Sequence, residues 1–337
     1  MLPYTIVTPA RNEEDNLPRL IQSIRSQTHL PVSWVVVNDG STDATPALLK
    51  EAAKELSFLE ILTLPPQQKA HYDRGFKYSF VVKQGFDHVL ESPERCRDIK
   101  LLGIVDADMF FRPDYFEELT NRFASEPKLG VASGIIYSKH GNHFIKEKDR
   151  PEQPRGSGRL IRMDCLEECG GYHVYKSMDS ILNIKARKRG WLTRSFSEMK
   201  MYQSRVTFSR RSYWHGFAHQ GRVSYYFGTP PFMALLKAGR YILLRPHHVF
   251  LPYLYGYFKD YFAKRPMIPD PEIVNFYRNE HLRIGFNRFV ERRSGARRLK
   301  KERGRHPGKP PNPGVQAQQE AEALYQDNSQ DSQEKSC

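Results

Sequence analysis

Hydrophobic residues in the first half of the chain follow two alternating spacings, which predict strands and helices in turn. Short apolar runs of strand length occur at 4–8, 32–37, 58–64, 100–105 and 129–136. Helical spacing or helix-start and helix-stop signals mark 16–27, 42–56, 69–85, 113–123, 163–169 and 179–189. Continuous apolar runs are typical of parallel strands that are buried on both faces. The alternation therefore predicts an α/β fold, with a mostly parallel sheet and helices on both faces.

The pattern changes in the second half of the chain. The segment 138–158 is rich in charge, glycine and proline, and we interpret it as a mobile loop. Residues 206–294 combine helical spacing with many Tyr, Phe and Trp, whereas residues 295–337 are polar and lose periodicity. We expect a main α/β domain over 1–205, an aromatic helical extension over 206–294 and a disordered tail over 295–337.

The net charge of +14 is unevenly distributed along the 337 residues. The stretch 288–309 carries ten Lys or Arg against two Glu, a net of +8, whereas 310–337 carries one Lys against five acids, a net of −4. A basic protein suits an anionic ligand, such as a nucleotide diphosphate, or an anionic membrane surface. For the tail, a solvated surface that aids solubility is an equally open interpretation.

Composition also bears on the compartment. A predicted strand begins at Tyr4, so no signal-peptide pattern is present. The longest apolar stretch without Asp, Glu, Lys or Arg, 246–258, has 13 residues, and a membrane-spanning helix needs about 20. Four cysteines without disulfide-like spacing favour a reducing compartment. We expect a cytoplasmic protein, with the aromatic and basic segment 225–262 in peripheral contact with anionic membrane at its cytoplasmic face.

Acidic residues directly follow two of the predicted strands. Asp39 comes after the second strand, and Asp106 and Asp108 come after the run Leu-Leu-Gly-Ile-Val at 101–105. Because ligands of open α/β sheets bind at the carboxyl ends of the strands, these carboxylates should lie along one edge. Carboxylates two residues apart are suitable ligands for Mg²⁺ or Mn²⁺, which bridge diphosphate oxygens. For each cluster alone, turn and helix-cap residues remain an open interpretation.

Several other enzyme classes lack their signatures in this sequence. No Gly-x-Gly-x-x-Gly follows the first strand and no Gly-Lys-Ser loop occurs, which argues against dinucleotide dehydrogenases and P-loop enzymes. His-Glu-x-x-His and Gly-x-Ser-x-Gly are absent as well, which argues against zinc proteases and α/β-hydrolases.

Four ordered motifs make the sequence resemble a family 2 glycosyltransferase with the GT-A fold. They are Thr-Pro-Ala-Arg-Asn-Glu-Glu at 8–14, Val-Val-Val-Asn-Asp-Gly-Ser-Thr-Asp at 35–43, Asp-Ala-Asp at 106–108 and the stretch 156–172 that ends in Gly-Gly-Tyr. The segment 178–190 also matches the family's stretch that ends in Arg-x-x-Gly. The resemblance covers roughly residues 1–230. It implies an inverting transferase that uses a nucleotide sugar and a divalent metal, with its catalytic domain in 1–205.

The resemblance assigns donor and metal roles to the matched positions. The donor-binding residues would be Pro9, Arg11, Glu13, Asp39, Lys69, Arg74, Asp106 and Arg222. Asp39 would address the base, and a carboxylate there suits an N–H of uracil or guanine, hence a UDP- or GDP-sugar. Asp108 and Asp106 would bind Mg²⁺ or Mn²⁺, with His219 completing the metal shell. An exposed helix face for Lys69 and Arg74, and an ordinary packed or surface role for His219, remain open.

Asp179 matches the carboxylate that acts as general base in inverting members of the family. It would take the proton from the acceptor hydroxyl as that oxygen attacks the anomeric carbon. The preceding residue, Met178, departs from the family's usual Glu, which removes one carboxylate but leaves the matched base. Asp179 could also cap the helix predicted to follow it, and the two roles are compatible.

The acceptor and two competing functions complete the interpretation. We expect the acceptor to be a lipid-linked or glycan hydroxyl, since family members that build lipid-linked glycans act at the membrane. A sugar-phosphate nucleotidyltransferase is the alternative enzyme, but its first loop is generally glycine-rich, and residues 8–14 contain no glycine. A non-catalytic nucleic-acid binder would suit the charge, yet acidic residues occupy the edge where phosphates would lie. We therefore expect a nucleotide-sugar donor and no nucleic acid as partners.

Overall fold

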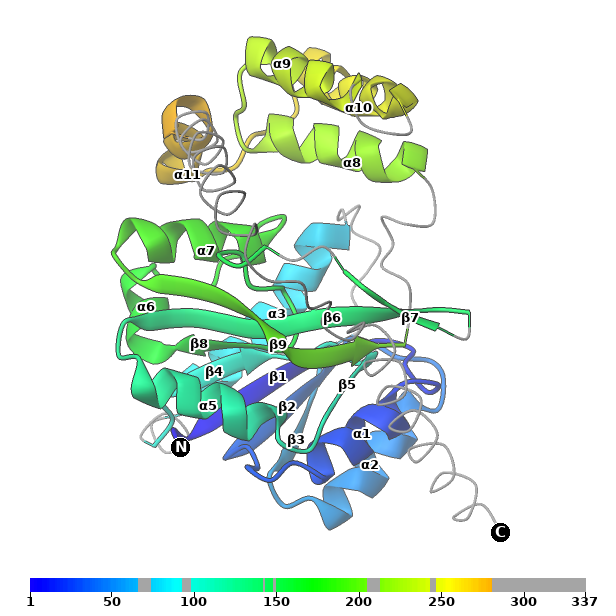
Figure 1. Ribbon diagram of the computed structural model, residues 1–337. Coiled ribbons are helices and arrows are strands. Elements are labelled where there is room, and N and C mark those ends of the chain that lie inside the picture. Colours follow the sequence, from blue (N-terminus) through cyan, green and yellow to red (C-terminus); the bar gives the residue numbers. More distant parts are fainter. Residues whose placement is uncertain are drawn as a thin grey trace, which may run out of the picture. The chain divides into compact units, whose positions relative to one another are not determined.

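The computed structural model describes residues 1–65, 74–92, 98–141, 143–147, 150–204, 213–242 and 247–280. These residues form two compact units, 1–204 and 213–280 (Figure 1). The domain boundary expected between 205 and 206 and the expected tail over 295–337 lie outside the described residues.

One sheet organises the first unit. Its nine strands among the described residues are β1 (Tyr4–Ala10), β2 (Ser33–Asn38), β3 (Leu59–Thr63), β4 (Leu101–Ile104), β5 (Met109–Phe111), β6 (Leu129–His140), β7 (His143–Lys146), β8 (Arg159–Arg162) and β9 (Leu192–Gln203). They are ordered β3-β2-β1-β4-β8-β6-β9-β5, and β7 pairs with β6. Strands β3, β2, β1 and β4 are parallel, as are β6 and β9, whereas β8, β7 and β5 pair antiparallel with their neighbours. The predicted α/β class with a mostly parallel sheet is confirmed.

Helices cover both faces of this sheet. They are α1 (Leu17–Arg25), α2 (Thr45–Glu55), α3 (Arg74–Leu90), α5 (Tyr115–Ser125), α6 (Met163–Glu168) and α7 (Met178–Lys188). In Figure 1, α1, α2 and α5 lie below the sheet, and α3 and α7 lie above it. Alternate residues of each central strand therefore pack against different helices. On β1, Ile6 belongs to the core that α1 and α5 share, whereas Val7 faces Gly85 of α3.

Buried strands explain why the first half of the chain was readable from its sequence. Every residue of β2 is buried, and β1 is buried apart from a half-buried Pro9. The largest fully buried side chain, Trp34, donates its indole N–H to Thr8 Oγ1 at 2.9 Å. That bond satisfies the one polar group that this side chain would otherwise leave unpaired in the core.

The segment 138–158, which its composition suggested to be a mobile loop, begins with strand residues, whereas its described residues 150–158 lie in no helix or strand. β6 continues to His140, and β7 returns antiparallel to it after a turn at Gly141. Phe144 of β7 packs in a small cluster with aromatic residues of neighbouring strands, so this hairpin has its own apolar anchor. Charge and glycine dominate the composition here because only one face of the hairpin is covered.

Strand β9 has no counterpart among the predicted elements. Its burial alternates imperfectly along the sequence, and its pairing with β6 shifts register between Ser133 and Ile135. A β-bulge interrupts the two-residue period that identifies a strand in sequence. The strand matters for the site because its last residue, Gln203, pairs with Met109 of β5.

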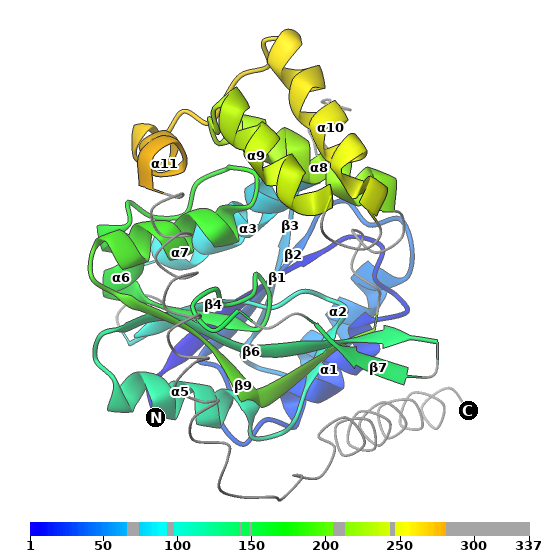
Figure 2. The same ribbon diagram turned by 45° about the horizontal axis from the view of Figure 1, so that its top comes forward.

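The second unit is a small aromatic helical cluster. It contains α8 (Tyr213–Tyr226), α9 (Pro231–Ile242), the 3₁₀ turn η2 (His247–Val249), α10 (Phe250–Phe262), α11 (Pro271–Asn275) and the π-helical turn η3 (Phe276–Glu280). Helices α9 and α10 lie on the same side of α8 (Figures 1 and 2). Gly221 and Gly256 stand where α8 and α10 cross, and a side chain at either would collide with the facing backbone. In the part of the chain that the structure describes, no helix is long and apolar enough to cross a bilayer.

Gly158 fixes the loop that leads into β8. Its φ of +63° lies in the left-handed region, and an added Cβ would collide with the sulfur of Met201. Gly141 has a matching φ of +60° but no heavy atom within 4 Å of its Cβ position. Alanine substitution at each of the two glycines therefore separates the free-energy cost of a left-handed backbone from the cost of steric overlap in the core.

We expect Gly158→Ala to lower the free energy of unfolding by about 1–3 kcal/mol more than Gly141→Ala does. Both variants suffer the left-handed penalty of about 1–2 kcal/mol, but only the first overpacks the core. Urea unfolding of the two variants measures the difference. Equal destabilisation would mean that Met201 moves aside freely.

Candidate active site

Three parallel strands end together at one edge of the sheet and carry the polar motifs there. β1 ends at Ala10, β2 at Asn38 and β4 at Ile104, and the backbone N–H of Asp39 donates to Ala10 O at 2.9 Å. The loops that follow these strands are therefore neighbours, as expected for the carboxyl edge of an open α/β sheet.

Reciprocal hydrogen bonds lock the first two loops to each other. Asn12, with a left-handed φ of +54°, donates its N–H to Ser41 Oγ and accepts from Thr42 N. In the same way Glu14 N donates to Asp43 Oδ2, and Ala44 N donates to Glu14 Oε2. These residues satisfy backbone groups, so their role in the described structure is to fix the loops.

Asp39 lies between two cations at the bottom of this edge. Its Oδ2 pairs with Arg11 Nη1 at 3.3 Å and with Lys77 Nζ at 2.7 Å, and its side chain is only 9% exposed. Both ion pairs use the same oxygen, so Oδ1 accepts no bond from the described residues. Lys77 lies on α3, one turn beyond Arg74.

Pro9 and Glu13, the other two residues expected at the nucleoside, lie on the same edge. Pro9 is half-buried on β1 beside Val37. Glu13 accepts from Asn16 Nδ2 at 2.9 Å, and its backbone N–H donates to Thr45 Oγ1 at 2.8 Å. The visible contacts of Glu13 therefore stabilise the start of α1, and its contact with a nucleoside stays a prediction.

Asp106 and Asp108 occupy the turn between β4 and β5, and each accepts a hydrogen bond from a side chain of a distant element. Tyr78 of α3 donates its hydroxyl to Asp106 Oδ1 at 2.7 Å. Gln203, the last residue of β9, donates to Asp108 Oδ2 at 3.1 Å. Both carboxylates are half-buried. Their positions are thus set by two elements from distant parts of the chain.

The loop before β8 brings a third carboxylate to the pair. Ser157 Oγ accepts the backbone N–H of Asp106 at 2.7 Å. A Cβ added to Gly156, the adjacent residue, would lie 3.7 Å from the Cβ of Asp179 and 3.9 Å from its Oδ2. One dipeptide therefore bonds to Asp106 through Ser157 and faces Asp179 with Gly156. We name Asp106, Asp108 and Asp179 together the acidic edge.

Asp179 is placed by an unusual helix start. It is the second residue of α7, and the preceding Ser177 has a left-handed φ of +54° without a side-chain cap bond. Asp179 is therefore inside the helix and does not act as its N-cap. Its carboxylate lies in the first turn, where the helix dipole favours negative charge.

Burial and mutual repulsion raise the pKa of the acidic pair. For Asp106, burial raises the pKa, hydrogen bonds from Tyr78 and Ser157 oppose the rise, and the charge of Asp179 adds to it. For Asp108, burial and then the charge of Asp106 raise the pKa to about 7, against the hydrogen bond from Gln203. A bound cation would favour the ionised form of both carboxylates and so reduce their repulsion.

A buried arginine lies behind the acidic edge and was not anticipated from sequence. Arg159 opens β8 and is fully buried, and one guanidinium nitrogen donates to Pro154 O and to Asn183 Oδ1, both at 3.0 Å. Its Nε and Nη1 have no hydrogen-bond partner. Burial lowers the pKa of Arg159, and the charge of Asp179 is the main effect that opposes the decrease. Arg159 therefore supplies fixed positive charge beneath the acidic edge.

Four of the predicted site residues are not placed at this edge by the described structure. Lys69 lies outside the described residues, and Arg74 begins α3 but its side chain is not described. His219, which is exposed, and Arg222, which is half-buried, lie on α8 in the second unit. Their roles toward metal and diphosphate stay predictions.

The acidic pair fits a hard divalent cation that keeps other ligands. Among the described residues, no cluster of three or more His, Cys, Asp and Glu side chains could hold a metal by itself. Mg²⁺ and Mn²⁺ accept carboxylate oxygens, and Mg²⁺ in nucleotide sites usually has one or two protein carboxylates plus phosphates and water. Asp106 and Asp108 supply that number, so the remaining ligands would come from the diphosphate and solvent.

Without metal, the free energy of unfolding should fall as the pH rises from about 4 to about 7. The pKa of Asp108 is raised in the folded state, so protonated Asp108 favours folding and its ionisation opposes it. By linkage the loss is at most about 4 kcal/mol, and Asp108→Asn should remove this part of the pH dependence. Urea unfolding of both proteins in EDTA at pH 5 and 7.5 measures it. The same pH slope in both proteins would show that Asp108 titrates normally.

Comparisons with known proteins agree with this geometry. Residues 5–179, more than half of the chain, match the family model described as Glycosyl transferase family 2. A 4,4'-diaponeurosporenoate glycosyltransferase from Staphylococcus aureus (strain MRSA252) is 31% identical over 130 residues, 38% of this chain and 30% of the relative. The putative glycosyltransferase EpsH of Bacillus subtilis (strain 168) is 24% identical over 129 residues, 38% of this chain and 33% of the relative. The chain thus matches about a third of the length of these curated relatives.

A solved structure shares the fold. The mannosyltransferase PcManGT from Pyrobaculum calidifontis, in complex with GDP-Man and Mn²⁺, is similar with a TM-score of 0.51 at 16% identity. The similarity covers 80% of this chain and 77% of that protein. Sheet topology, motif order and the family match lead to one conclusion: the chain belongs to glycosyl transferase family 2 and is a glycosyltransferase with the GT-A fold.

Proposed function

We propose that the protein transfers a sugar, with inversion, from a UDP- or GDP-sugar to a hydroxyl of a lipid-linked or glycan acceptor. The observation that carries the proposal is the convergence of the acidic edge. Ser157 of the dipeptide Gly156-Ser157 is hydrogen-bonded to Asp106, and the open side of Gly156 faces Asp179. A donor site requires a pair of carboxylates that can bind a metal. Deprotonation of the acceptor requires a separate carboxylate next to that pair.

The proposed nucleoside site is the part of the sheet edge around Asp39. Its Oδ1 accepts no bond from the described residues, whereas Oδ2 is held by Arg11 and Lys77. A carboxylate fixed in this way would accept an N–H of uracil or guanine through the remaining oxygen. The similar structure of PcManGT contains GDP-Man, which is compatible with a guanine donor but does not select one for this chain.

The proposed metal site is the acidic pair, with Asp108 as the main ligand and Asp106 shared between metal and ribose. A bound Mg²⁺ or Mn²⁺ would neutralise the charge that develops on the nucleoside diphosphate as it leaves. Tyr78 and Gln203 hold the two carboxylates through one oxygen each, which limits the directions in which they can turn. The side chains therefore pre-organise the diphosphate position before donor binding.

The proposed base is Asp179. Its carboxylate takes the proton of the acceptor hydroxyl, the hydroxyl oxygen forms a bond to the anomeric carbon, and the bond from that carbon to the diphosphate oxygen breaks. A single displacement inverts the anomeric carbon and needs no nucleophile from the protein. Asp179 lies in the first turn of α7, and the buried Arg159 is near enough to interact with its charge.

Asp179→Asn should lower kcat by about 10²- to 10⁴-fold, because the amide cannot accept the proton. The affinity for UDP or GDP in the presence of Mn²⁺ should change little, since Asp179 is assigned to the acceptor. A coupled assay for released nucleotide, together with calorimetric titration of the nucleotide, measures both quantities.

Asp164→Asn is a matched control, because Asp164 is an exposed carboxylate in the first turn of the neighbouring helix α6. It should leave both quantities unchanged. Undiminished transfer by Asp179→Asn would exclude Asp179 as the base.

We also propose that the second unit contacts an anionic membrane surface. Ten of the 18 exposed large hydrophobic residues of the described chain lie in this smaller unit. On α9 they form a stripe of Phe232, Leu235, Leu236 and Ile242, whereas Ala234 and Ala238 face the interior. The described residues of the unit carry seven Lys or Arg against four Asp or Glu. An amphipathic helix of this kind lies in the interface between lipid and water.

A further inference from the structure

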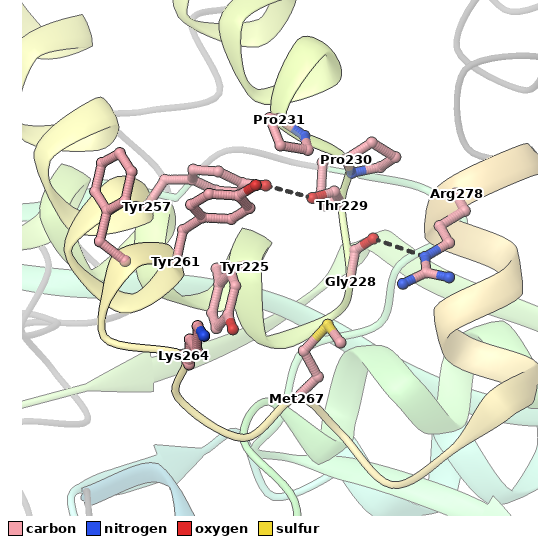
Figure 3. A pocket seen from close by; sticks show the side chains of 11 residues that line it. Tyr225, Gly228, Thr229, Pro230, Pro231, Tyr257, Tyr261, Lys264, Met267 and Arg278 are labelled. Carbon is pink, nitrogen blue, oxygen red and sulfur yellow. Dashed lines mark hydrogen bonds between the residues drawn. The ribbon is translucent and has the colours of Figure 1, made fainter.

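The second unit contains a cavity of about 590 Å³ that no step of sugar transfer uses. It lies entirely within this unit, and residues before α9, along α10 and after α10 line it (Figure 3). Sites for small molecules usually measure about 300–1,000 Å³, so this one has room for a ligand of more than a few atoms.

Aromatic rings form the main wall of the cavity. Tyr225 stands edge-on to Tyr257 and Tyr261, and those two rings are stacked on each other. The hydroxyls of Tyr225 and Tyr257 donate to backbone carbonyls, those of Arg265 and Thr229, at 2.8 and 2.7 Å. The O–H groups of two of the three tyrosines therefore already donate hydrogen bonds to the protein. The wall offers ring surface with few hydrogen-bond partners, which suits a hydrocarbon chain.

The charged residues of the cavity are both basic. Lys264 and Arg278 line it, and none of the described residues that line it is acidic. Arg278 donates through Nε to Gly228 O at 3.4 Å, which ties it to the cavity rim. Lys264 has a left-handed φ of +46° in the turn after α10. In Figure 3 the two cations stand on different sides of the aromatic wall.

The cavity also opens onto the apolar surface of the unit. Phe262, which lines it, is 75% exposed, and Met267 and Tyr261 are each 41% exposed. Pro231, the first residue of α9, is part of the lining. The cavity mouth is therefore continuous with the helix that we assign to the membrane surface.

We infer that this cavity binds the hydrocarbon chain of a single phosphate-bearing membrane lipid, with Lys264 meeting the phosphate. The aromatic wall, the absence of acidic lining residues and the exposed apolar mouth carry the inference. It rests on the proposed function only in that the lipid comes from the membrane that α9 contacts. Its role would be to hold the second unit on a chosen lipid, in addition to general attraction to anionic membrane.

The test is calorimetric titration of the full-length protein with dodecyl phosphate below its micelle concentration. Dodecyl maltoside supplies the same chain with a neutral glycan head, and inorganic phosphate supplies a head without a chain. We expect one dodecyl phosphate per protein, binding at least about tenfold more tightly than either control. If inorganic phosphate bound as tightly as dodecyl phosphate, the cavity would be a phosphate site and not a lipid site. Equal binding of the maltoside would show a glycan or detergent surface, and either result overturns the inference.

Two variants separate the cavity from the membrane surface. Lys264→Asn keeps a residue that tolerates the left-handed backbone and should weaken dodecyl phosphate binding about tenfold. Met267→Trp should weaken it at least as much by filling the mouth. Lys259→Asn, which removes an exposed cation of α10 outside the cavity, should have no effect. Unchanged binding in both Lys264→Asn and Met267→Trp would contradict the inference, and thermal unfolding confirms that each variant is folded.

Vesicle flotation distinguishes a failure of this inference from a failure of the proposed function. Leu235→Ser with Leu236→Ser removes part of the α9 stripe and should reduce flotation with vesicles of neutral and anionic phospholipid. The same double variant should bind dodecyl phosphate normally, because neither leucine lines the cavity. Normal flotation of the variant would refute the membrane contact of α9, whereas loss of dodecyl phosphate binding would refute the separate cavity site.

Discussion

Repulsion among the carboxylates of the acidic edge is the constraint on which the rest of the first unit depends. Asp106 and Asp108 are half-buried two residues apart, and the pKa of each is raised by burial and by a neighbouring carboxylate. Left alone, such groups would take up protons or turn away from each other. Tyr78, Gln203 and the backbone bond to Ser157 prevent the second response. The fold therefore holds two carboxylates at a position where a bound cation would relieve their repulsion.

The elements around the edge can be understood as supports for this arrangement. The parallel strand β4 delivers two of the acidic residues, antiparallel β8 follows the loop that faces the third, and β9 delivers the amide that fixes Asp108. Arg159 lies fully buried beneath, with two nitrogens unpaired. An incompletely satisfied buried guanidinium costs stability, and nearby negative charge offsets part of that cost. The acidic edge and Arg159 thus stabilise each other across the start of β8.

How far the site could be predicted depended on the kind of signal each residue carries. Asp39, Asp106 and Asp108 follow apolar runs, and strand ends meet at one edge, so local pattern was enough to group them. Lys77 and Tyr78 had a weaker signal, since they lie three and four residues beyond Arg74 on one helix face. Gln203 contacts Asp108 across 95 positions of sequence, and its strand is interrupted by a bulge. No sequence pattern near either residue predicts such a contact. The hairpin β6–β7 was missed because its polar face dominates its composition.

The two units differ in the kind of surface that they present to solvent. The first gathers charge at a sheet edge, where a nucleotide diphosphate and a metal would balance it. The second gathers aromatic and aliphatic surface that water solvates poorly, with cations at its margin. The two sets of features suit different ligands. A hydrocarbon chain packed on a charged edge would remove the hydration of the charges, and an aromatic wall offers a diphosphate few hydrogen-bond donors.

Thermal unfolding with UDP or GDP, in the presence of Mn²⁺ or of EDTA, tests the central claim most directly. If the acidic edge is a site for metal and diphosphate, one of the two nucleotides should raise Tm only when Mn²⁺ is present, because a ligand stabilises only as far as it binds the folded state. An equal rise in EDTA, or no rise with either nucleotide and Mn²⁺, would contradict the account.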